Sequence, residues 1–140
     1  MNDSNNLELG IIGNCHSSAL ISKTGSIVWC CLPEFDSPSV FGKILDNNIG
    51  GTFQIICDNN YSIEQQYLKN TCILVTKFSS GKNIFEVHDF MPRYLKKDNK
   101  YHSPAEVIRY FKLISGKPKF KINYDPKLEY SSCKTDTLIK

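Results

Sequence analysis

Short apolar stretches separated by turn-forming residues run through the whole chain, and no long amphipathic helical pattern interrupts them. The stretches are rich in β-branched and aromatic residues, which favour strands. Their regular spacing is typical of a β-sandwich, whose short strands are joined by tight turns. We therefore predict an all-β chain that folds as an antiparallel β-sandwich and forms one domain over residues 1–140.

Three pairs of stretches flank turn signals and are predicted to form hairpins. They are 19–22 with 27–31, 52–57 with 61–67, and 72–78 with 84–90. A further pairing is expected between 106–114 and 119–124, across the turn residues 115–118. Residues 40–45 are compatible with a single helical turn, and the polar run 93–103 is interpreted as an exposed loop.

Charge and hydropathy exclude several classes of partner. The chain has 17 Lys and Arg against 14 Asp and Glu, a net charge of +3. Because the lysines are dispersed, no nucleic-acid surface is predicted. No apolar run approaches the roughly 20 residues that cross a bilayer, and the polar start lacks the apolar region of a secretory signal. We expect a cytoplasmic protein with no membrane partner.

The six cysteines do not form a recognisable metal or redox motif. No two of them are spaced C-x-x-C, and no His follows at the spacing of a zinc finger. Most of them sit in apolar stretches, so we predict buried free thiols rather than a metal or redox site. The chain also lacks both the P-loop pattern and the strand-linked G-x-G-x-x-G pattern, and no cofactor is predicted.

The clearest candidate site follows the apolar stretch around the only Trp. Two prolines bracket a short segment with two carboxylates, and prolines stiffen the backbone that presents them. The candidate residues are Pro33, Glu34, Phe35, Asp36, Ser37, Pro38 and Ser39. A contact with another domain or the rim of a pocket, direct chemistry, and turn formation at residues 36–38 are the three alternatives for this loop.

The same segment carries a family resemblance. Residues 25–41 resemble D-G-S-I-D-W-L-C-L-P-R-F-D-S-P-S-V-F, near the start of the N-terminal β-sandwich of bacterial and archaeal glycoside hydrolase family 15, the glucoamylase and trehalase-like enzymes. Other blocks keep the family's order. Residues 13–20 are similar to I-G-D-C-R-T-A-A-L, 66–71 to R-Y-L-P-D-T, 87–92 to V-T-D-F-M-P, and 109–116 to R-x-V-x-G-x-x-G.

This resemblance implies a sandwich domain followed by an (α/α)6 barrel that hydrolyses α-glucosidic bonds with inversion, using two glutamates of the barrel. By the same resemblance the chain is about the first half of the sandwich, is not catalytic by itself, and supports and partly shapes the barrel. The implied partners are the barrel of the same parent chain, an α-glucan or trehalose, and other copies bound through exposed sheet edges. The alternative is a free-standing carbohydrate-binding or protein-interaction module.

The chain departs from the family pattern at three positions. Asn14, His16 and Glu34 stand where the family commonly has Asp, Arg and Arg. Each change alters the charge of a loop expected to face the barrel or a sugar. If an Arg of the family paired with an acidic group across the domain boundary, Glu34 would repel that group.

Other polar and aromatic residues have plainer interpretations. Glu34 and Asp36 are two residues apart, so in an extended segment they share a face, which suits a common contact better than opposite sides of a scissile bond. Trp29 is expected in the core rather than in a sugar platform with Phe35. His88 and Asp89 fall on opposite faces of a strand, which weakens the case for a catalytic dyad, and Asp89 is predicted to cap a turn. His16, His88 and His102 are expected to be structural or surface residues.

Overall fold

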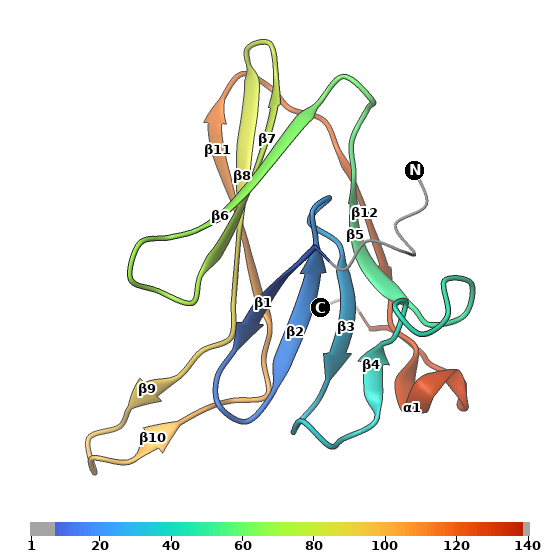
Figure 1. Cartoon of the computed structure of the whole chain (residues 1–140), viewed down its shortest axis with the longest axis vertical. Helices are drawn as coiled ribbons and strands as arrows, with labels where there is room; N and C mark the ends of the chain where they lie inside the picture. The colour runs from blue at the N-terminus through green and yellow to red at the C-terminus, as the bar shows by residue number, and fades with distance from the viewer. Residues whose placement is uncertain (1–7, 139–140) are drawn as a thin grey trace.

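The computed structural model describes residues 8–138 and confirms an antiparallel β-sandwich (Figure 1). Sheet A has the order β1 (Leu9–Gly13), β2 (Ser18–Ser22), β3 (Ile27–Cys31), β5 (Thr52–Ile56), β12 (Lys121–Asp125), and β4 (Ser39–Phe41) also pairs with β3. Sheet B has the order β11 (Ile108–Ser115), β8 (Asn83–Phe90), β7 (Leu74–Ser80), β6 (Ser62–Tyr67). A separate ribbon contains β9 (Tyr94–Leu95) and β10 (Tyr101–His102), and a short turn, α1 (Leu128–Ser131), follows β12.

Two of the predicted hairpins are confirmed, because β2 pairs with β3 and β7 pairs with β8. The prediction for 52–57 with 61–67 is wrong, since β5 pairs with β3 and β12 whereas β6 pairs with β7. The pairing of 106–114 with 119–124 is wrong for the same reason, as β11 lies in sheet B and β12 in sheet A. In both places the chain crosses between sheets, and turn residues mark a reversal without showing which sheet the next strand joins.

Two smaller expectations also change. Residues 39–41 form β4, so only the residues after Phe41 turn. The predicted loop 93–103 contains the β9–β10 ribbon, which extends away from the sandwich (Figure 1).

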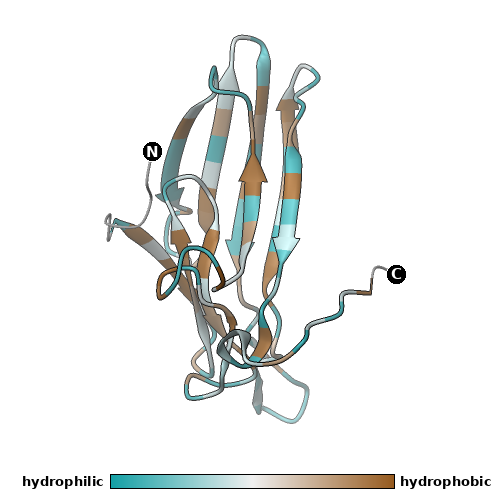
Figure 2. Cartoon of the chain, turned by 90° about the vertical axis from the view of Figure 1, so that its right-hand side faces the viewer, coloured by the Kyte–Doolittle hydropathy of each residue, from teal (hydrophilic) through white to brown (hydrophobic). Residues whose placement is uncertain are grey.

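The core lies between the two sheets, where every second side chain of a strand points inward. Brown and teal bands alternate along the strands in Figure 2, as this pattern requires. Near the middle of sheet B the rings of Phe78 and Phe85 stack with centroids 4.7 Å apart, and both side chains are fully buried. The other fully inward apolar side chains include Ile12, Ala19, Ile21, Ile27, Cys30 and Val87.

One buried charged pair joins the two sheets. Arg109 on β11 and Asp89 on β8 are cross-strand neighbours, and both side chains are almost completely buried. Arg109 Nε donates to Asp89 Oδ1 at 2.7 Å, and Nη2 donates to Oδ2 at 3.1 Å. The same guanidinium donates from Nη1 to the Phe53 carbonyl at 3.0 Å and from Nη2 to the Gly25 carbonyl. One side chain of sheet B therefore binds a carbonyl of β5 in sheet A and a carbonyl of the turn between β2 and β3.

The burial of this pair has an electrostatic cost. Burial raises the pKa of Asp89 above its ordinary value, and the hydrogen bond and charge of Arg109 offset that rise only in part. The prediction that Asp89 caps a turn is wrong, because β8 continues to Phe90 and its alternation directs Asp89 inward with Phe85 and Val87. Asp89 and His88 do lie on opposite faces, as predicted.

The cysteines divide into two groups. Cys30 and Cys31 are buried and Cys57 is half-buried, and burial raises the pKa of Cys30 to about 12 and that of Cys57 to about 11. These two thiols are therefore protonated and unreactive near neutral pH. Cys15, Cys72 and Cys133 are exposed, so the prediction of buried thiols is wrong for half of the six. All six are free thiols, as predicted.

Replacing Asp89 by Asn would leave the Arg109 charge buried without its partner. We expect Asp89→Asn to lower the free energy of unfolding by about 3–5 kcal/mol, as measured by urea denaturation. The matched control is Asp125→Asn, because Asp125 pairs with Lys127 at 2.9 Å on the surface. Its expected loss is about 1 kcal/mol or less.

Equal losses in the two variants would show that the Asp89–Arg109 pair does not fasten the sheets. The double variant Asp89→Leu with Arg109→Met distinguishes the pair from simple loss of volume. It should recover part of the stability lost in Asp89→Asn, since no charge is left in the core.

Candidate functional site

The candidate loop at residues 33–38 joins β3 to β4 at one end of the sandwich. The backbone N–H of Glu34 donates to Ser37 Oγ at 3.1 Å, and the N–H of Ser37 donates to the Glu34 carbonyl at 3.2 Å. Phe35 lies at the centre of this closed turn and is 59% exposed. The loop therefore presents an apolar ring between two exposed carboxylates, Glu34 and Asp36.

The loop differs from the predicted geometry in two respects. The segment turns rather than extends, so a two-residue spacing no longer places Glu34 and Asp36 on one face. The segment does turn, but the hydrogen bonds that close the turn join Glu34 and Ser37 rather than residues within 36–38. Pro33 and Pro38 are exposed and flank the turn.

Ser39 does not belong to the exposed surface. It lies in β4, is buried, and its Oγ has no hydrogen-bond partner among the described residues. It lines a cavity of about 60 Å³, together with Gly42, Gly50 and Tyr130. A cavity of this size can hold a water molecule, whose share of liquid volume is about 30 Å³. Ser39 therefore lies beneath the exposed surface that the rest of the loop presents.

Asn14 joins neighbouring segments at this end of the sandwich through hydrogen bonds of its side chain and its carbonyl. Its Oδ1 accepts hydrogen bonds from the N–H groups of His16 and Ser17 at 3.1 and 3.0 Å. Its Nδ2 donates to the Pro104 carbonyl at 2.9 Å, and its own carbonyl accepts from Ser103 Oγ at 3.0 Å. Ser17 Oγ in turn donates to the carbonyl of Cys31, at the start of the candidate loop.

Asn14 is almost fully buried, so its side chain is not part of the exposed surface of this loop. It joins the turn after β1 to the segment that leads back from β10, and Ser17 connects that turn to Cys31, just before the 33–38 loop. His16 is exposed at the same end, as expected of a surface histidine. The signal that the sequence offered was an Asn directly after a strand, a type of residue that often fixes a turn through its side chain.

Trp29 lies on the outer face of sheet A rather than in the core. It pairs with Leu20, and Leu20 pairs with Ile11, so the three side chains share one face. The ring of Trp29 is half-buried and lies 6.4 Å from the ring of Tyr130, measured between centroids. The neighbouring Cys30 takes the inward position, which explains why the core prediction is wrong.

The other two histidines have local structural partners. His88 Nε2 lies 2.9 Å from Glu86 Oε2 on the outer face of sheet B. The ring of His102 meets the ring of Tyr94 edge-on, with centroids 5.3 Å apart. Their placement agrees with the prediction of structural or surface roles.

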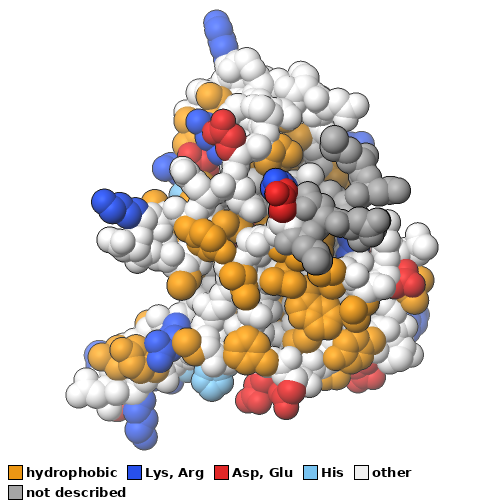
Figure 3. Space-filling view, viewed as in Figure 1, with side chains coloured by type: hydrophobic (Ala, Val, Ile, Leu, Met, Phe, Trp, Pro, Cys, Tyr) orange, Lys and Arg blue, Asp and Glu red, His pale blue; other side chains and the backbone are white. Residues whose placement is uncertain are grey.

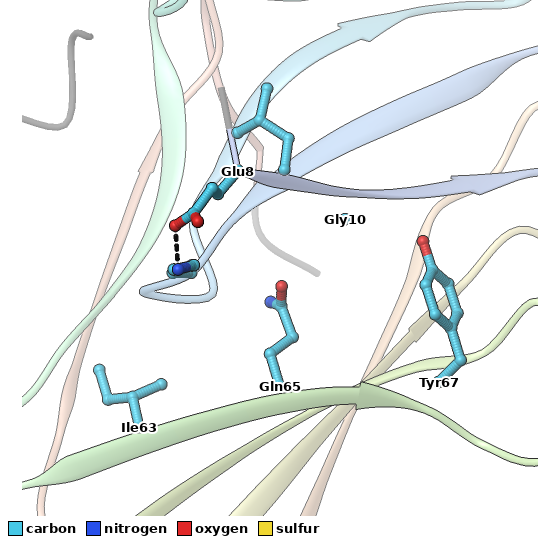
Figure 4. A pocket seen from close by; sticks show the side chains of 7 residues that line it. Glu8, Gly10, Ile63, Gln65 and Tyr67 are labelled. Carbon is cyan, nitrogen blue, oxygen red and sulfur yellow. Dashed lines mark ion pairs between the residues drawn. The ribbon is translucent and has the colours of Figure 1, made fainter. Parts of the chain in front are cut away.

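A groove of about 450 Å³ separates the edge strands β1 and β6 (Figure 4). Its polar side chains fasten these strands. Tyr67 Oη donates to the Ile11 carbonyl and accepts from the Ile11 N–H, both at 2.8 Å. Gln65 Nε2 donates to the Ser22 carbonyl at 3.1 Å, and Lys23 forms an ion pair with Glu8. The groove therefore lies at a junction between the two sheets, and Tyr67, Gln65 and Lys23 all have partners within the protein.

Within residues 8–138, no three His, Cys, Asp or Glu side chains gather closely enough to hold a metal ion. In the same range, no helix has the length and apolar character needed to span a membrane.

Comparison with known proteins gives a consistent family. The model of a family described as "Trehalase-like, N-terminal" matches residues 3–139. The trehalase of Thermoplasma volcanium is 37% identical over 130 residues, which cover 89% of this chain and 20% of that protein. Trehalase 1 of Sulfolobus acidocaldarius is 45% identical over 84 residues, which cover 60% of this chain and 15% of that protein.

A relative of lower identity matches a similar share of this chain. The trehalase of Mycobacterium tuberculosis is 25% identical over 139 residues, which cover 88% of this chain and 20% of that protein. No solved structure matches the chain. The chain spans about a fifth of the length of the relatives it matches. It belongs to the family of trehalase-like N-terminal domains, which confirms the resemblance to the sandwich domain of family-15 glycoside hydrolases.

Proposed function

We propose that this chain is the non-catalytic N-terminal sandwich of a longer trehalase-like glycoside hydrolase, and that it supports and partly shapes an (α/α)6 catalytic barrel of the same parent chain. The observation that carries this proposal is the family match over residues 3–139 of a chain that spans about a fifth of its trehalase relatives. The 140-residue chain by itself is inactive in this proposal.

The carboxylates of the described residues support an inactive chain. An inverting glycosidase needs an acid and a base on opposite sides of the scissile bond, with space for a water between them. Glu34 and Asp36 lie in an exposed turn closed by Ser37. Asp89 is buried and its two oxygens accept from Arg109. Asp89 is therefore not available to a sugar, and Glu34 and Asp36 belong to one short turn rather than to two sides of a pocket.

The 33–38 loop is the proposed point of contact with the barrel. It offers Phe35 as an exposed apolar anchor, and aromatic side chains are enriched at the centres of interfaces. Glu34 and Asp36 would face a neutral or basic surface of the barrel, because an acidic surface would be repelled. A contact of this loop with trehalose or an α-glucan at the rim of the barrel belongs to the same proposal.

An open edge of the sandwich gives the parent chain a second place to pack. Ile122 pairs with the buried Ile55, Tyr124 with the inward Phe53, and Leu113 with the buried Phe85. Paired residues share a face, so all three side chains point toward the core. They are nevertheless 50%, 47% and 63% exposed, because β11 and β12 are the last strands of their sheets. We call this row of three the open seam.

The free thiols agree with the expected location. Disulfides persist in oxidising compartments and are rare in the cytosol. Six free cysteines, three of them exposed, suit a reducing compartment. A cytoplasmic location is therefore part of the proposal.

One observation favours the second candidate, a free-standing carbohydrate-binding module. The rings of Trp29 and Tyr130 lie together on the outer face of sheet A, and aromatic faces can stack on the apolar face of a sugar. Binding of maltooligosaccharides by the 140-residue chain, abolished by Trp29→Ala, would support this candidate over the first.

The proposed function is tested with the full product of the encoding gene. We expect that product to release glucose from trehalose, whereas the 140-residue chain releases none. In the full product, Phe35→Ser should lower kcat/KM at least about fivefold, the effect of losing roughly 1 kcal/mol at a contact that positions the barrel. Tyr110→Ser is the matched control, because Tyr110 is similarly exposed on the outer face of sheet B and should leave kcat/KM unchanged.

A gene that ends after Lys140, or trehalose hydrolysis by the 140-residue chain itself, would contradict the proposed function. Full activity in the Phe35→Ser variant would reject only the contact at the 33–38 loop.

The open seam predicts the behaviour of the 140-residue chain in solution. Uncovered apolar side chains beside unpaired strand edges promote association. We expect light scattering to detect dimers or larger species, and Ile122→Lys to shift them toward monomer. Leu68→Lys is the control, because Leu68 is an exposed apolar residue of the β6–β7 turn. A wild-type chain that stays monomeric at high concentration would show that the sandwich is complete without a partner.

A further inference from the structure

The β9–β10 ribbon, residues 93–102, projects from the same end of the sandwich as the 33–38 loop (Figure 1). We call it the arm. Its strands pair through Leu95 with Tyr101 and Tyr94 with His102. The connecting turn is closed by hydrogen bonds from the Lys96 N–H to the Lys100 carbonyl at 2.9 Å and from the Asn99 N–H to the Lys96 carbonyl at 3.0 Å. The arm is therefore an ordered ribbon.

The arm is fixed at its base and unsupported beyond it. Asn14 binds both residues that follow β10, donating to the Pro104 carbonyl and accepting from Ser103 Oγ. Neither β9 nor β10 pairs with a strand of sheet A or sheet B. A two-stranded ribbon is only marginally stable alone in water, so a covering surface would stabilise it.

Both faces of the arm are apolar and exposed. Leu95 and Tyr101 are opposite each other and share one face, where the guanidinium carbon of Arg93 lies 3.9 Å from the centre of the Tyr101 ring. Tyr94 and His102 share the other face. Tyr94, Leu95 and Tyr101 are each more than half exposed. Tyr and Arg are the residue types that most often anchor protein interfaces.

The arm is also strongly basic. Besides Arg93 it carries three lysines and one acid: Lys96, Lys97, Lys100 and Asp98. Figure 3 shows it at the lower left as a projection with orange and blue side chains. An acidic surface with an apolar centre would complement both its charge and its rings.

We infer that the arm docks on an acidic, apolar-centred surface of the catalytic part of the parent chain, burying Leu95 and Tyr101 on one side and Tyr94 on the other. This inference rests on the proposed function. Three observations favour that occupant: Asn14 and Ser17 link the base of the arm to the start of the 33–38 loop, the chain is about a fifth of its relatives' length, and the lysines of the arm would repel the same basic arm of a second copy.

Trypsin reports on the docking directly, because it cleaves after the lysines at the tip. In the full gene product we expect cleavage at Lys100 to be at least about tenfold slower than in the 140-residue chain. The double variant Lys96→Glu with Lys97→Glu keeps Lys100 as the reporter and should repel the acidic surface. In that variant the rates for the full product and for the 140-residue chain should become equal.

The matched control reverses two lysines near the β7–β8 turn, at the other end of the sandwich (Figure 1). Lys82→Glu with Lys117→Glu makes the same change in net charge and should leave the protection of Lys100 intact. Added salt should weaken the wild-type protection, because salt screens exposed charges.

Three results would overturn the inference. Equal cleavage at Lys100 in the two wild-type forms would show that the arm stays undocked, and trehalose hydrolysis by the same full product would leave the proposed function standing. Protection that rises with the concentration of the 140-residue chain would identify a second copy as the occupant. A gene that ends after Lys140 would remove the occupant and the proposed function together.

Discussion

The sandwich depends on the guanidinium of Arg109, which makes four hydrogen bonds in a space from which water is excluded. Two of them hold Asp89 in its own sheet, and two reach the backbone of the facing sheet at Phe53 and Gly25. A buried carboxylate and a buried guanidinium are each costly, so neither is tolerated without the other. The pair therefore fixes how the two sheets face each other, while the apolar core supplies most of the favourable free energy.

The two edges of the sandwich differ in how they are closed. On one side Tyr67 bonds to both backbone groups of Ile11 and Gln65 reaches the Ser22 carbonyl, so side chains close the seam between β1 and β6. On the other side β11 and β12 end their sheets and leave core-facing apolar groups in solvent. This asymmetry is what the proposed function requires, because a longer trehalase-like chain would pack on the apolar edge.

Residue patterns were sufficient for most of the longer strands, for the hairpins that stay within one sheet, and for the family, but they did not predict β1, β4 or the β9–β10 ribbon. They failed at residues 57–61 and 115–120, because the crossing between sheets is set by which apolar faces can be buried together. The pair of Asp89 and Arg109 does have a signature in the sequence: Asp89 alternates in phase with Phe85 and Val87, and Arg109 with Phe111. A charged residue in phase with apolar neighbours is directed into the core.

The 33–38 loop was found from its prolines, but its turn is closed by Ser37, and the strand end that leads into it is bound by Ser17, which Asn14 holds in turn. Such links between distant segments cannot be predicted from the spacing of residues in the sequence.

Amide hydrogen exchange, compared between the full gene product and the 140-residue chain, tests the account most directly. The account predicts slower exchange in the full product along β11, β12 and the 33–38 loop, with no change in the β2–β3 hairpin. Equal exchange at all these segments would show that nothing packs on them and would contradict it.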